Sequence, residues 1–144
     1  MIQNVMTTGF LAWCSFHDCR KRTIPLWGLL LGFAAASLFR AASFVLHDGR
    51  ELWTFGLIGM VPGFFLCAVS RISGGIGAAD GIMFLVTGVL LGFEENLTLL
   101  WITLLETAAF GGIEAFRKKG KKAGIPMAPF ILAGFVLMRI LGNL

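Results

Sequence analysis

The run Gly74-Gly75-Ile76-Gly77-Ala78-Ala79-Asp80-Gly81 places one carboxylate among small residues at the start of a long apolar segment. A charge in such a place is costly unless it is paired or has a function, because neither a bilayer nor a protein core solvates it. The matching carboxylate is Asp18, which also lies at the edge of an apolar segment and is followed by basic residues and Ile24-Pro25. We expect the chain to fold around these two aspartates.

The composition is that of a membrane protein. Apolar residues make up 57 % and charged residues 14 % of the 144 positions, and the mean hydropathy is +0.84. These values lie far outside the range of soluble domains. The 14 Phe, 4 Trp and 19 Gly fit helices that pack closely in a bilayer. The sequence therefore predicts one transmembrane domain over residues 1–144, embedded in the lipid bilayer.

Six apolar stretches each approach the ~20 residues that a helix needs to cross the hydrocarbon. Helices satisfy their own backbone polar groups in lipid, and none of these stretches alternates with the period of two that a barrel strand requires. The sequence predicts an all-α, polytopic membrane helical bundle of about six transmembrane helices, with a kink in the third at Pro62. The predicted spans are residues 2–17, 25–46, 52–70, 76–93, 97–116 and 124–143.

The basic residues are distributed unevenly between the links. Nine of the 12 Lys and Arg residues fall in the links 18–23, 71–75 and 117–122, whereas the other links contain only Arg50. By the positive-inside rule the basic links face the cytoplasm of a cell membrane and both termini lie outside. Asp18 and Asp80 then lie at cytoplasmic helix ends. This clustering explains the net charge of +4 without a nucleic-acid partner.

Three glycine pairs and three buried charges bear on packing. Glycines one turn apart allow close helix contacts, either within the chain or in a homo-oligomer. Arg40 and Arg139 lie inside predicted spans, where they either reach the outer headgroups or pair with Glu106 in the middle of span five. The glycine pairs are Gly28-xxx-Gly32, Gly59-xxx-Gly63 and Gly88-xxx-Gly92.

Two carboxylates brought together at a membrane edge do not both ionise cheaply, so they share a proton. In an aspartic peptidase the ionised member activates a water and the protonated member donates to the scissile carbonyl. This chemistry needs no metal or cofactor. Gly77 and its neighbours leave room for an extended peptide beside Asp80. A solvated helix cap is the other interpretation of each aspartate.

Three stretches resemble the signatures of the type IV prepilin peptidase family, whose members are GxGD-type intramembrane aspartic proteases. The first resembles the family's Asp, basic cluster and Ile-Pro; the second is similar to its GxGD-type motif; the third resembles its Pro-x-x-Pro-Phe opening of the last span. They are Asp18-Cys19-Arg20-Lys21-Arg22-Thr23-Ile24-Pro25, Gly77-Ala78-Ala79-Asp80 and Ile125-Pro126-Met127-Ala128-Pro129-Phe130.

The resemblance implies that Asp18 and Asp80 are the catalytic pair of an aspartic endopeptidase, supported by Gly77, Ala79 and Ile24-Pro25. It implies removal of short basic leader peptides from prepilin or pseudopilin precursors at the cytoplasmic membrane face. Where the family has Gly before the second aspartate, this chain has Ala79. The chain resembles compact, peptidase-only members without the N-methyltransferase extension.

Other classes of function stay open at this stage. A small proton or cation transporter would use the same two aspartates as relays. A non-catalytic assembly subunit of a pilus or secretion apparatus would retain the peptidase shape. Cys14, His17, Asp18 and Cys19 suggest a metal site, but the chain has no second cluster to complete four ligands, so we predict none.

Overall fold

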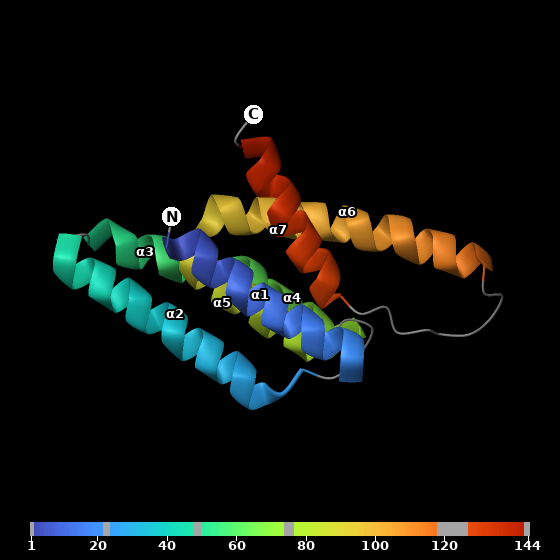
Figure 1. The fold of residues 1–144 in the computed structure, drawn as a ribbon, viewed down its shortest axis with the longest axis horizontal. Coiled ribbons are helices and arrows are strands. Elements are labelled where there is room, and N and C mark those ends of the chain that lie inside the picture. The colour runs from blue at the N-terminus through green and yellow to red at the C-terminus, as the bar shows by residue number, and fades with distance from the viewer. Residues whose placement is uncertain (1, 22–23, 48–49, 74–76, 118–126, 143–144) are drawn as a thin grey trace.

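A computed structural model describes residues 2–21, 24–47, 50–73, 77–117 and 127–142. These residues form seven helical segments with no strand among them, which confirms the expected all-helical fold (Figure 1). Residues 74–76, 118–122 and 125–126, on which parts of the predicted motifs and the basic link fall, lie outside the described residues. The helices are α1 (Ile2–Lys21), α2 (Leu26–His47), α3 (Arg50–Gly59), α4 (Val61–Ser73), α5 (Ala78–Leu91), α6 (Phe93–Arg117) and α7 (Ala128–Gly142).

The predicted third span consists of two helices, α3 and α4, which meet at Met60. Pro62 lies in the first turn of α4 and has no amide hydrogen to donate to a carbonyl of α3. This break confirms the predicted kink. Among the described residues, three stretches are long and apolar enough to cross a membrane, and α5 and α7 are shorter apolar helices. The three stretches are Leu26–Ser43, Thr54–Ile72 and Phe93–Ile113.

Helix α5 forms the centre of the bundle, because it packs against α2, α3 and α4 and most of its side chains are buried. Phe84 and Val86 are fully buried there. A methyl group on Gly63 of α4 would lie 2.5 Å from the backbone nitrogen of Leu85. Only glycine therefore lets the two backbones approach this closely.

The glycine pairs of the sequence pack within this chain. Gly59, Gly63 and Gly88 face the backbone of a neighbouring helix at distances that a side chain would not permit, and Gly28 and Gly32 lie against aromatic side chains of α1. This agrees with the intramolecular interpretation of the small-residue spacing. The contacts are Gly59 with Gly88, Gly28 with Trp13, and Gly32 with Phe10.

The C-terminal end of α5 is capped by side chains from other helices. The Nε of Arg40 donates to the Val89 carbonyl at 2.6 Å, and its Nη2 donates to the Leu90 carbonyl at 2.9 Å. The side-chain amide of Gln3 also donates to Leu90. A helix end leaves carbonyls without partners and favours a cation. Arg40 thus stabilises the end of α5, and its bonds to these carbonyls take the place of the pairing with Glu106 that the sequence suggested.

A buried amide joins the start of α6 to the centre of the bundle. The Nδ2 of Asn96 donates to the carbonyls of Gly59 at 2.8 Å and Phe84 at 3.0 Å. Its Oδ1 accepts a hydrogen bond from the Thr87 hydroxyl at 2.8 Å. Because Asn96 is fully buried, these bonds replace all its contacts with water.

Helix α7 packs against α1 and α6 and crosses α6 at a steep angle (Figure 1). The Nη2 of Arg139 lies 2.5 Å from the Oε2 of Glu95 near the start of α6. Further along the crossing, the rings of Phe130 and Phe110 lie 5.2 Å apart. Arg139 therefore has Glu95 as its partner, and the pairing with Glu106 that the sequence suggested is absent.

Candidate active site

Asp18 lies near the C-terminal end of α1 with its side chain turned into the protein, where the residue is only 9 % exposed. Its Oδ2 accepts a hydrogen bond from the backbone amide of Ala128 at 3.2 Å. Ala128 is the first residue of α7, where the helix leaves amides without internal partners. The start of the last helix therefore holds the Asp18 carboxyl group in place.

Asp80 lies in the first turn of α5, and its backbone amide donates to the Gly77 carbonyl at 3.1 Å. Gly77 precedes the helix in an extended conformation. A methyl group on Gly77 would lie 3.0 Å from the Oδ2 of Asp80, so the carboxyl group rests directly against this glycine. Because Gly77 has no side chain, the Asp80 carboxyl group is not crowded at this position.

The two aspartates come from helices that pack against each other, and they lie at the same end of the bundle. The charge of Asp18 acts electrostatically on the carboxyl group of Asp80. The site therefore contains two neighbouring carboxyl groups, one from α1 and one from α5. Chemically it suits a shared proton and a water held between an acid and a base.

The other residues named by the sequence take part in core packing and in the start of α2. Ile24 packs against the buried core, and the Pro25 carbonyl accepts hydrogen bonds from Gly28 at 3.0 Å and Leu29 at 3.3 Å. These contacts begin α2 immediately after the basic residues. Ala79 is half-buried and also packs against the core. The bundle thus accommodates the methyl group at the position where the resemblance predicts glycine.

The residues of the suggested metal cluster have other surroundings. Cys14 is buried, Cys19 is exposed, and the His17 ring stacks on Trp13 with their centroids 4.4 Å apart. In the part of the chain that the structure describes, no three His, Cys, Asp or Glu side chains come together in a group that could hold a metal ion.

Sequence reasoning did not find the Ala128 amide. Almost every residue has a backbone amide, so the residue type does not identify the one that acts as a donor. The sequence contains only an indirect indication of it. Pro129 directly follows Ala128, and proline is common in the first turn of a helix. A proline near the start of a predicted span therefore marks a helix N-terminus, which is a place that attracts a carboxylate.

Fold and side chains together define the class: an all-helical membrane protein with two interacting carboxyl groups at one end of its bundle. Comparison with known proteins identifies the family. The description "type IV leader peptidase family" matches residues 5–113, and the chain belongs to that family.

One curated relative is the prepilin leader peptidase/N-methyltransferase of Bacillus subtilis (strain 168). It is 32 % identical over 96 residues, which cover 65 % of this chain and 39 % of the relative. The chain therefore spans well under half the length of the curated relative that it matches. No solved structure matches the chain.

Proposed function

We propose that this protein is an intramembrane aspartic endopeptidase that removes short basic leader peptides from prepilin or pseudopilin precursors. Membership of the type IV leader peptidase family supports a peptidase. The observation that carries the aspartic mechanism is the placement of Asp18 near the end of α1 and of Asp80 at the start of α5, two helices that contact each other. Two carboxyl groups so placed supply both the acid and the base that peptide hydrolysis requires.

In this mechanism the ionised carboxylate of the pair takes a proton from a bound water. The water oxygen attacks the scissile carbonyl carbon while the protonated carboxyl group donates to the carbonyl oxygen. As the tetrahedral intermediate collapses, the carbon–nitrogen bond breaks and the leaving amine takes a proton from the pair. Each carboxyl group thus serves first in one role and then in the other.

The scissile segment binds in an extended form, because a helix hides its carbonyl carbons from a nucleophile. We expect an extended substrate backbone to lie beside Gly77, where the absence of a side chain leaves room next to the Asp80 carboxyl group. The Ala128 amide fixes Asp18 on the other side. The proposed site is thus built from helices that are far apart in the sequence.

We further propose that the protein is a multi-pass protein of the cell membrane, with its aspartates and basic links facing the cytoplasm and both termini outside. Arg20 and Lys21 end α1 beside Asp18. Near the two chain ends, Gln3 contacts Leu90 at the opposite end of α5, and Arg139 contacts Glu95 near the start of α6. This arrangement supports the positive-inside orientation.

Leader removal in cells tests the activity. The protein is co-expressed with candidate prepilins, and the precursor and product are separated on a gel and weighed by mass spectrometry. We expect Asp18→Asn and Asp80→Asn each to lower cleavage by at least about 1,000-fold, because paired catalytic groups act as a unit. Thr98→Ala, on an exposed part of α6, is the matched control.

Cleavage that survives either Asn variant would reject the paired-aspartate mechanism. Strong chelator should leave cleavage unchanged. Aspartate-dependent proton or cation flux in liposomes without any cleavage would instead favour a transporter. For orientation, the exposed Cys19 should react with a membrane-impermeant maleimide in inverted vesicles and not in intact spheroplasts.

A further inference from the structure

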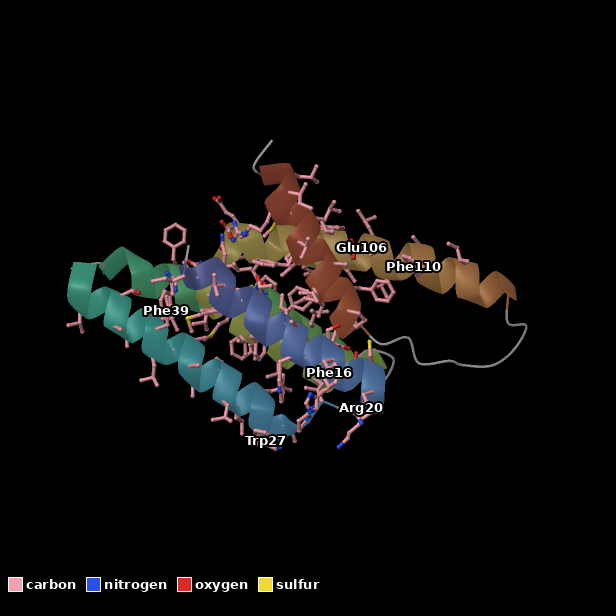
Figure 2. All side chains as sticks on the ribbon, in the orientation of Figure 1. Phe16, Arg20, Trp27, Phe39, Glu106 and Phe110 are labelled. Carbon is pink, nitrogen blue, oxygen red and sulfur yellow. The ribbon has the colours of Figure 1, made fainter. Side chains whose placement is uncertain are left out.

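A groove of about 520 Å³ lies along α7, where this helix runs between α1 and α6. Its walls are mostly apolar, and two polar residues, one from α1 and one from α6, flank it. Figure 2 shows one of these, Glu106, beside the crossing of α6 and α7. The residues that carry the argument are Ser15, Glu106, Pro129, Ala133, Val136 and Ile140.

The groove begins beside the candidate catalytic pair. Ser15 lies nearly one turn before Asp18 on α1. Pro129 follows Ala128, whose amide binds Asp18. From Pro129 to Ile140 the axis of α7 rises by about 16 Å, which is roughly half the thickness of the hydrocarbon. A segment lying in the groove would therefore start beside Asp18 and follow α7 away from it.

Glu106 makes this groove unlike a surface that only contacts lipid. Its Oε2 is buried and has no hydrogen-bond partner among the described residues. The arginines that could have paired with it are engaged elsewhere, Arg40 with carbonyls of α5 and Arg139 with Glu95. Lipid tails contain no donor, and a carboxyl group facing them is costly. Glu106 is only partly buried and lines the groove, so a donor side chain lying in the groove can supply a partner to this carboxyl group.

We infer that the groove binds the first turns of the substrate's apolar transmembrane helix, and that Glu106 selects substrates with a hydrogen-bond donor side chain there. This inference rests on the proposed function, in which the helix follows the scissile bond. Phe130 lies beside Phe110, and Gly134 lies beside Thr103. These two contacts show how α6 and α7 are aligned. Glu106 on α6 therefore lies opposite a position on α7 about four residues, or roughly 6 Å along the helix axis, after Ala128. The donor belongs about one helical turn after the cleavage site.

Site-specific photocrosslinking tests where the substrate lies. A benzophenone amino acid replaces Ala133 in the groove or, as a control, Leu38 on α2, which is 70 % exposed. Both carry Asp80→Asn so that precursor is retained. We expect precursor crosslinks at position 133 several-fold above those at 38. Equal yields at both positions, or crosslinks to lipid alone at 133, would overturn the inference.

Substrate selection tests the role of Glu106. Precursors with Ser or with Leu one turn after the cleavage site are compared as substrates of the wild type and of Glu106→Leu. We expect the wild type to prefer the Ser precursor by roughly tenfold, mainly through KM, and the variant to lose this preference. An unchanged preference would overturn the role of Glu106.

These experiments separate the inference from the proposed function. If the wild type cleaves precursors but position 133 gives no specific crosslink, the groove assignment is wrong and the peptidase assignment stands. If no precursor is cleaved but position 133 crosslinks specifically, the peptidase assignment fails and the groove remains a binding site for an apolar helix.

Discussion

Asp18 at the end of α1 accepts a hydrogen bond from the backbone amide of Ala128, 110 positions later in the chain. The bond joins the end of one helix to the start of another at the place where α1 and α7 meet. A helix N-terminus presents backbone amides without internal partners, and one of them donates to the Asp18 carboxyl group. The last helix thus contributes to the candidate site through its backbone.

Replacing Ala128 by proline should remove this donor. Proline is tolerated at the first position of a helix, so α7 itself should form. A carboxylate that loses a buried amide partner costs about 1.5–3 kcal/mol, and we expect cleavage to fall at least about tenfold. Ala128→Gly keeps the amide and should cleave nearly as well as the wild type. Similar losses in both variants would mean that the amide is not responsible. Leader removal under initial-rate conditions gives the comparison.

Gly81 follows Asp80 in α5 and lies against Cys67 of α4. A methyl group at this position would lie 2.5 Å from the Cys67 Sγ and 2.9 Å from the Cys67 nitrogen. Because a backbone atom does not move aside cheaply, Gly81→Ala should push the helices apart and cost about 1–3 kcal/mol. We also expect reduced cleavage, since the neighbouring Asp80 moves with the helix.

The matched control for Gly81 is Gly112, which lies in α6 with open space around it. Gly112→Ala should raise the free energy of unfolding by up to about 1 kcal/mol, because alanine favours helix over glycine. The two variants should therefore change the melting temperature in opposite directions. Tryptophan fluorescence during heating in detergent measures both. A stabilised Gly81→Ala protein would contradict the close approach.

Hydropathy and backbone chemistry were enough to predict the helical fold and the break before Pro62. The alternation of charged links also placed Asp18 and Asp80 at one end, because charge distribution reports topology independently of packing. The end of α5 was less predictable. Gly92 was interpreted as half of a packing pair, but it ends the helix with a φ of 84°, a conformation that favours glycine.

The partners of the buried charges could not be predicted from the sequence. Arg40 had an obvious carboxylate to pair with in Glu106, yet it binds two carbonyls about 50 positions away. Every helix end offers such carbonyls, and a sequence does not say which end lies beside a given arginine. For the same reason the sequence did not identify the Ala128 amide as the partner of Asp18. The two aspartates could be singled out in the sequence because their side chains are chemically distinctive. The group that holds Asp18 in place is a backbone amide, which residue type does not mark.

Arg40→Met should destabilise the protein by about 2–3 kcal/mol, because two carbonyls at the end of α5 lose charged donors. Arg71 is exposed near the end of α4, so Arg71→Met should cost about 1 kcal/mol or less. Thermal unfolding in detergent compares the two. If Arg40 instead reached the headgroups, as its position in the sequence allowed, both variants would cost equally little.

Asn96 and Thr87 should behave as one unit. Asn96→Leu removes donors to the Gly59 and Phe84 carbonyls and should cost about 1–3 kcal/mol, since the site is fully buried. Thr87→Val removes the hydroxyl that donates to the Asn96 side chain. Because both variants break that shared bond, the double variant should cost about 0.5–1 kcal/mol less than the sum of the single variants. Thr98→Ala, whose hydroxyl bonds to Glu94 on an exposed surface, provides a control that should add independently to either variant. Strict additivity between Asn96→Leu and Thr87→Val in chemical or thermal unfolding would show that the amide holds α3, α5 and α6 together without the hydroxyl.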